Sequence, residues 1–142
     1  MVPTCLLSED KQMLLTPERD EKIRVSAYPN AYVIHHYLLG HTAFVYALAF
    51  YTAGETTYLL SGGGGTEMIC WDYRNDRRAS SVDYLQHFDA THPEKPWASW
   101  HAPDLIALKQ FIVHRGQIYA LFEKFPLSST LHRSTRKLTM QC

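Results

Sequence analysis

The sequence has little cysteine, no net charge and no long apolar run. Three widely spaced cysteines form no CxxC pair, so a zinc ribbon is not indicated. No apolar run approaches the roughly 18 residues of a membrane-spanning helix. The formal net charge of zero removes the overall attraction that often drives binding to nucleic acid or membranes. We therefore expect neither a zinc module nor a membrane protein.

Signals for export are also missing. The first residues, MVPTCLLSEDK, show no basic segment followed by an apolar core, so no signal peptide is predicted. An odd number of distant cysteines fits a reducing compartment. We expect the nucleus as the site of action, with the cytoplasm as the second choice.

The residues that are abundant favour a packed β domain. Hydrophobic residues make up 46% of the 142 and charged residues 20%, which is enough apolar surface for one core and argues against disorder. Nine Tyr, six Phe and three Trp add to this, because aromatic residues favour strands.

An internal repeat organises the first half of the chain. LLTPERDEKIRVSAYPN (Leu14 to Asn30) aligns without a gap on LLSGGGGTEMICWDYRN (Leu59 to Asn75). Each copy reads as strand, turn and alternating strand, which predicts a hairpin. Two further strand patterns, Ala31 to Gly40 and Phe44 to Gly54, separate the copies. Four strands in 45 residues match the blade of a β-propeller, which repeats at about 40–45 residues.

We therefore predict an all-β fold of about two to three β-propeller blades, in an incomplete propeller. Residues 1–78 hold the second half of one blade and a complete blade, and residues 79–104 form a long connection. Residues 105–142 form a partial third blade with a basic tail. The third blade begins with a hairpin turning at Arg115 and Gly116, with Ile118, Ala120 and Phe122 on one face. Because propellers close with four to eight blades, we expect the chain to be part of a longer protein.

Motifs for catalysis, metals and cofactors are not found. No lysine follows the glycine run Gly62 to Gly65, so it is no phosphate-binding P-loop. We expect a turn between strands, with glycine supplying positive φ. The adjacent His35 and His36 would point to opposite faces of a strand, and no G-x-S-x-G elbow is present. We predict no catalytic residue, no metal and no small-molecule cofactor.

A dense set of charges fills the first hairpin turn, PERDEKIR, from Pro17 to Arg24. Such a turn is usually only a solvated tip. The second copy of the repeat makes the same turn with glycine, however, so the hairpin does not need charge for its geometry. Mixed charge on a rigid tip can instead orient a protein partner.

The motifs together resemble one WD-repeat family. Gly40-His41 and Trp71-Asp72 bracket a blade, and RDEKIRVS is followed about fifteen residues later by GHT and then FV. This pattern resembles the WD-repeat, non-catalytic subunit of the tRNA guanine-N7 methyltransferase. The resemblance is strong over residues 13–78 and faint beyond them.

The resemblance implies a scaffold and not an enzyme. It implies a heterodimer with the catalytic methyltransferase subunit, which holds the S-adenosylmethionine site and contacts tRNA, so that this chain meets tRNA only indirectly or weakly. The partner-binding residues carried over are Asp20, Glu21, Lys22 and Arg24. The structural WD-repeat residues carried over are His41, Trp71 and Asp72.

One expectation and two alternatives remain open. Counting back from Trp71 puts Gly63 and Gly65 where a blade has its hydroxyl and its turn Asp, so half of the hydrogen-bonded set is lost unless Ser61 or Thr66 substitutes. The chain could also be a generic WD-repeat scaffold with another partner. A third possibility is direct RNA binding through the tail residues Arg133, Arg136 and Lys137.

Overall fold

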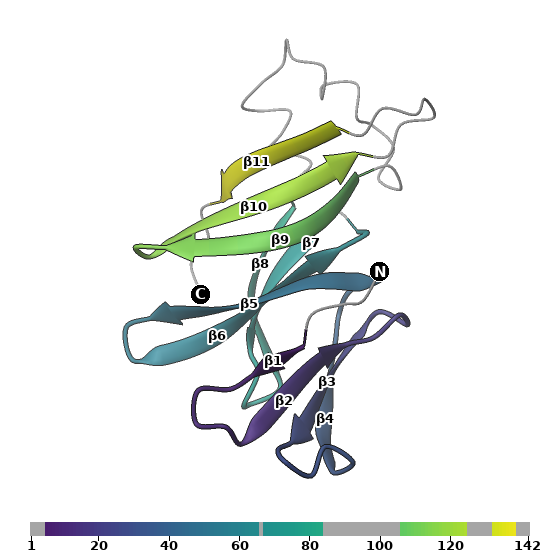
Figure 1. Ribbon diagram of the computed structural model, residues 1–142, viewed down its shortest axis with the longest axis vertical. Coiled ribbons are helices and arrows are strands. Elements are labelled where there is room, and N and C mark those ends of the chain that lie inside the picture. The colour runs from purple at the N-terminus through teal and green to yellow at the C-terminus, as the bar shows by residue number, and fades with distance from the viewer. Residues whose placement is uncertain (1–4, 66, 84–105, 125–131, 139–142) are drawn as a thin grey trace.

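The computed structural model describes residues 5–65, 67–83, 106–124 and 132–138. These residues form strands and turns without a helix, so the described part contains no helix that could cross a membrane. The strands build three antiparallel sheets stacked on one another (Figure 1). The all-β blade architecture predicted from the sequence is therefore confirmed.

Each sheet is a series of hairpins. The first has the order β1-β2-β3-β4, with bounds Leu6–Leu7, Met13–Pro17, Lys22–Ala27 and Ile34–Leu39. The second has the order β5-β6-β7-β8, with bounds Val45–Ala53, Thr56–Gly63, Glu67–Asp72 and Arg77–Asp83. The third has the order β11-β10-β9, with bounds His132–Leu138, Gln117–Lys124 and Ile106–His114. Neighbours in sequence are neighbours in space, as in a propeller blade.

The repeat read from the sequence corresponds to equivalent hairpins. The β2–β3 hairpin and the β6–β7 hairpin are the second and third strands of their sheets. The expected third hairpin is also present as β9 and β10, with Arg115 and Gly116 at its turn in positive φ. Strand β8 runs through Asp83, so residues 79–83 extend the second sheet, although the sequence analysis gave them to the connection. Residues 84–104 of that connection lie outside the described residues.

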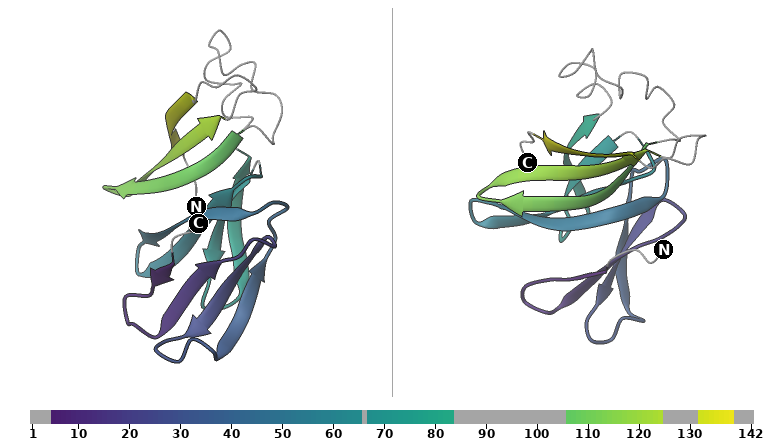
Figure 2. Two further views of the ribbon diagram at one scale, coloured as in Figure 1. Left: turned by 45° about the vertical axis from the view of Figure 1, so that its right-hand side comes forward. Right: turned by 45° about the horizontal axis from the view of Figure 1, so that its top comes forward.

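Two apolar cores hold the three sheets together. The first lies between the first and second sheets and contains Leu15, Ile23, Leu59 and Trp71. The second lies between the second and third sheets and contains Met68 and Cys70 of β7. Figure 2 shows the same stack from two further directions. The middle sheet is therefore covered on both faces.

The second core also contains the predicted face of β10. Ile118, Ala120 and Phe122 are all buried there, against Leu108 and Phe111 of β9. Alternation along β10 thus identified the inward residues correctly.

The glycine run has a different purpose from the one expected. None of its four residues has a positive φ, and Gly62 and Gly63 belong to strand β6. A Cβ on Gly63 would lie 2.2 Å from the carbonyl oxygen of Phe44, and one on Gly64 would lie 2.3 Å from the Phe44 ring. The Gly64 N–H donates to the Phe44 carbonyl over 3.0 Å. Close approach of the chain before β5, and not turn geometry, is therefore what requires glycine here.

Ser61 supplies the hydroxyl of the WD-repeat set. Trp71 Nε1 donates to Ser61 Oγ over 2.7 Å, and Ser61 Oγ lies 2.6 Å from His41 Nε2. Ser61 is paired with Ile69 on the neighbouring strand, so Trp71 lies diagonally across on the same face. The assignment of the hydroxyl position to Gly63 was wrong, because it was counted along the chain and not across the ladder, whereas the substitution by Ser61 that was considered beside it is confirmed. Thr66 lies outside the described residues.

Burial makes His41 a weak base. Desolvation lowers the pKa of His41 from 6.5 to about 4, while Glu67 acts to raise this pKa and Arg78 to lower it further. Glu67 and Arg78 form an ion pair with each other. At neutral pH the imidazole is therefore uncharged, and Ser61, which already accepts a hydrogen bond from Trp71, can donate its own proton to the ring.

We predict that Ser61→Ala destabilises the protein by about 1–3 kcal/mol, because it leaves the buried Trp71 N–H without an acceptor. Urea unfolding followed by circular dichroism measures this. In a Trp71→Phe background, which has no such donor, the same substitution should cost less. Equal costs in both backgrounds would show that the hydrogen bond does not matter.

We also predict that acid destabilises the protein through His41. The unfolded chain binds a proton near pH 6.5, whereas the folded chain does so only near pH 4. The contribution of the neutral His41 to the free energy of unfolding is therefore complete above pH 6.5. It is lost as the pH falls towards 4, by up to about 3 kcal/mol. Unfolding free energies of the wild type and His41→Gln should diverge over this range. Parallel pH profiles would contradict the assignment.

Candidate functional site

The charged turn joins β2 to β3 and is short and well defined. The Glu18 N–H donates to the Lys22 carbonyl over 2.8 Å, and Glu21 adopts a positive φ of 76°. Pro17 pairs with Ile23 directly beneath the turn, and Ile23 is fully buried. The turn therefore projects from a rigid base. Of the four predicted partner-binding residues, Asp20 and Glu21 lie in the turn itself, whereas Lys22 and Arg24 are the first and third residues of β3.

Two ion pairs form within the turn region. Lys22 Nζ lies 2.9 Å from Asp20 Oδ2, and this hydrogen bond is the main cause of both a lowered pKa of Asp20 and a raised pKa of Lys22. The Lys22 ammonium also lies 5.5 Å from the centre of the Tyr37 ring. Arg24 forms an ion pair with Glu18. Both pairs are partly exposed, so their own contribution to stability is small.

Three side chains in or beside this turn have a charge or a hydrogen-bond donor without a partner among the described residues. Arg19 and Glu21 are exposed, and among the described residues neither forms an ion pair. The Nε atom of Arg24 is buried without a hydrogen-bond partner in the described part of the chain. The turn thus presents internally neutralised pairs beside one free acid and one free base.

The WD-repeat residues divide into two groups. His41 and Trp71 are brought together by Ser61, as described above. Asp72 is not part of that set: its Oδ2 accepts from Asn75 Nδ2 over 2.9 Å and lies 3.4 Å from an Arg77 nitrogen. Asp72 therefore stabilises the turn after β7.

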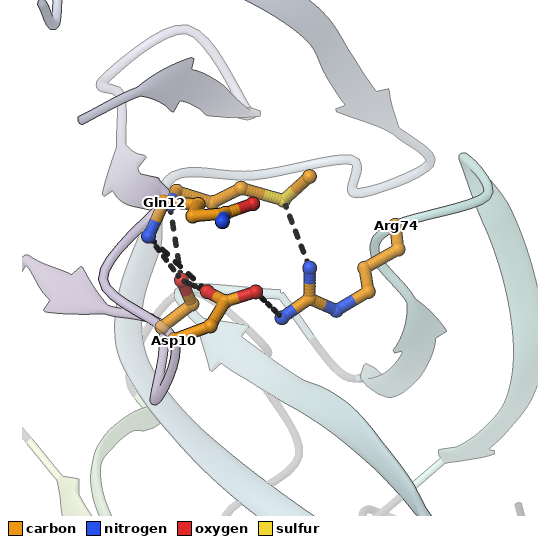
Figure 3. Close-up of polar contacts among 5 residues, drawn as sticks. Asp10, Gln12 and Arg74 are labelled. Atoms are coloured by element: carbon orange, nitrogen blue, oxygen red, sulfur yellow. Dashed lines mark hydrogen bonds and ion pairs between the residues drawn. The ribbon is translucent and has the colours of Figure 1, made fainter.

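The opposite end of the blades carries a second polar cluster that the sequence did not reveal. The β1–β2 and β5–β6 turns lie at this end, away from the charged turn (Figure 1). Here Arg74, in the turn after β7, donates to Asp10 Oδ2 over 3.0 Å (Figure 3). Ser8 Oγ and the Gln12 N–H both donate to Asp10 Oδ1, over 2.6 and 3.1 Å. These hydrogen bonds lower the pKa of Asp10, and the bond from Ser8 has the largest effect on this pKa.

A further hydrogen bond connects the same two sheets. His36 Nε2 donates to the Tyr73 carbonyl oxygen over 2.8 Å, while the neighbouring His35 is exposed. The two adjacent histidines therefore lie in different environments, as strand alternation predicted. Within the described ranges, no group of three or more His, Cys, Asp or Glu residues comes together as a metal site.

Several of these residues could not be found from sequence. No motif in the sequence singles out Asp10, and Arg74 lies 64 positions further along the chain. No local pattern joins two turns of different blades. The tail residues Arg133, Arg136 and Lys137 lie on β11, but their side chains are outside the described part.

Comparison with known proteins gives a consistent result. The family model described as "tRNA methyltransferase TRM82 WD40 domain" matches residues 2–139. A relative from Danio rerio, named as the tRNA (guanine-N(7)-)-methyltransferase non-catalytic subunit wdr4, is 42% identical over 93 residues. That alignment covers 65% of this chain and 22% of the relative. A relative from Debaryomyces hansenii, named as the TRM82 non-catalytic subunit, is 42% identical over 82 residues, covering 55% of this chain and 18% of the relative.

Solved structures show the same fold. The β-propeller domain of Cps50 (Swd1) from Myceliophteria thermophila superposes with a TM-score of 0.58 at 15% identity, covering 92% of this chain and 37% of that one. A chain of the Mitotic Checkpoint Complex superposes with a TM-score of 0.59 at 15% identity, covering 94% and 39%. The chain spans about a fifth of the length of the curated relatives that it matches. It belongs to the TRM82 WD40-domain family, and its three sheets are blades of a WD-repeat β-propeller.

Proposed function

We propose that this chain acts as part of the non-catalytic scaffold subunit of a tRNA guanine-N7 methyltransferase. In this role it binds and stabilises the catalytic subunit, so that 7-methylguanosine forms in tRNA. The match of the family model over residues 2–139, with relatives named as non-catalytic subunits, is the observation that carries the proposal. The catalytic subunit supplies the chemistry, and this chain needs no cofactor of its own.

The charged turn is the proposed contact with the catalytic subunit in a heterodimer. Lys22 and Arg24 pair with acids of the partner, and Glu21 pairs with a base. The geometry supports this in a specific way: the Asp20–Lys22 and Glu18–Arg24 pairs hold the two cations in defined positions before binding. Preorganised charges lose less conformational entropy on association than free ones.

The role of Glu18 and Asp20 follows from the same geometry. Each carboxylate neutralises a cation while the turn is exposed to water. On binding, acids of the partner join these pairs, and a network of alternating charges forms. Such networks favour the correct partner and the correct orientation more than they raise overall affinity. We propose the nucleus as the place of assembly, with tRNA contacted indirectly or weakly.

We predict that the double substitution Lys22→Glu and Arg24→Glu weakens binding of the catalytic subunit. Loss of one side of a desolvated charge pair costs about 2–5 kcal/mol, which corresponds to at least a tenfold rise in Kd. Co-purification and titration calorimetry measure the effect. The matched control is Lys11→Glu, a charge reversal in the exposed β1–β2 turn at the opposite end. Retention of the partner by the double variant would remove the turn from the interface.

A second experiment separates this function from a generic WD-repeat scaffold. Depletion of the protein should lower 7-methylguanosine in tRNA, and re-expression of the wild type should restore it. The double variant at Lys22 and Arg24 should restore it poorly. Unchanged 7-methylguanosine after depletion would favour a scaffold for another partner.

A further inference from the structure

A cleft of about 640 Å³ opens at the end of the blades opposite the charged turn. It lies between the first and second sheets. Its walls come from the β1–β2 turn, from β5 and β6, and from the turn after β7. The Asp10–Arg74 ion pair shown in Figure 3 forms part of this lining.

The cleft is acidic. Four carboxylates line it, from Glu9, Asp10, Glu55 and Asp72, against the two guanidinium groups of Arg74 and Arg77. Both guanidinium groups are already engaged, Arg74 with Asp10 and Arg77 with Asp72. Glu9 and Glu55 are exposed and, among the described residues, form no ion pair. Two uncompensated negative charges therefore remain.

Aromatic side chains provide the apolar part of the cleft. Phe50, Tyr58 and Tyr73 line it, and the rings of Phe50 and Tyr73 lie 5.7 Å apart. The Arg74 guanidinium lies 5.3 Å from the centre of the Tyr73 ring while it binds Asp10. The protein thus already holds one cation here by a carboxylate and an aromatic face, which is a favourable environment for a positive charge.

We propose that this cleft binds a lysine or arginine side chain carried by an extended segment of a protein partner. Glu9 and Glu55 attract the cation, and Phe50 and Tyr58 contact its methylene groups and a neighbouring apolar residue. This surface is separate from the charged turn, and the inference does not rest on the proposed function. It adds a second docking site at the opposite end of the blades.

Charge complementarity decides between a basic peptide and RNA. A nucleic acid would bring phosphates towards two unpaired carboxylates, and the two arginines are already neutralised. Phosphate contacts supply most of the affinity of proteins for nucleic acid. The cleft therefore disfavours RNA and favours a cationic protein segment.

Binding of matched peptides to the full chain tests the proposal. The probes are three fluorescein-labelled, C-terminally amidated peptides with leucines around a central lysine, norleucine or glutamate. Fluorescence anisotropy should show binding of the lysine peptide, weakened by added salt, and at least tenfold weaker binding of the other two. The double variant Glu9→Gln and Glu55→Gln should bind the lysine peptide at least tenfold more weakly than the wild type. Asp76→Asn, which neutralises an exposed acid outside the cleft, should bind it as the wild type does.

A second readout locates the peptide. Carbodiimide coupling joins a lysine amine to a carboxylate that touches it, and mass spectrometry should place the amide on Glu9 or Glu55. Equal binding of the lysine and norleucine peptides would overturn the proposal. Unchanged binding of the lysine peptide by the double variant, or coupling only to other carboxylates, would also overturn it. A tRNA transcript that displaces the peptide would do the same if the double variant binds this transcript no more tightly than the wild type does.

Discussion

The burial of the middle sheet on both faces is the constraint on which the rest of the structure depends. Along β7, Ile69 and Trp71 face the first sheet, whereas Met68 and Cys70 face the third. A strand with both faces covered can carry no unpaired polar group at low cost. The buried polar atoms of this sheet must therefore find partners within the protein, and those of Trp71 and Ser61 do so with each other and with His41, which precedes β5.

This constraint also explains the glycine run. Val45 pairs with Gly63 and the Gly64 N–H donates to the Phe44 carbonyl, so the backbone of the run lies directly beside Phe44 and leaves no room for a Cβ at Gly63. A side chain at Gly62 would meet Leu108 of the third sheet, since a Cβ would lie 2.9 Å from it. The run thus permits dense packing on two sides. The charged turn of the first sheet has no comparable cover among the described residues, so its positions are free to carry charged side chains.

The two ends of the blades have different electrostatic character. The charged turn has cations held in place by its own acids, whereas the cleft at the opposite end has acids left over after its arginines are paired. The two proposed docking surfaces, of different chemistry and at opposite ends, would suit the protein to bridging two partners. This arrangement follows from antiparallel hairpins, which send alternate turns to opposite ends of each sheet.

The sequence by itself determined the all-β class, the hairpin repeat, the alternating inward faces and the position of the charged turn, because these depend on local periodicity and turn chemistry. It assigned the hydroxyl of the WD-repeat set to Gly63 and offered Ser61 only as a substitute, since Ser61 and Trp71 are related across a strand ladder and not by a count along the chain. Only the tertiary structure showed why glycine is needed beside Phe44, and only it brought Asp10 to Arg74. Such contacts join residues of different strands and blades, whose proximity is decided by how the sheets stack and leaves no local signal in one sequence.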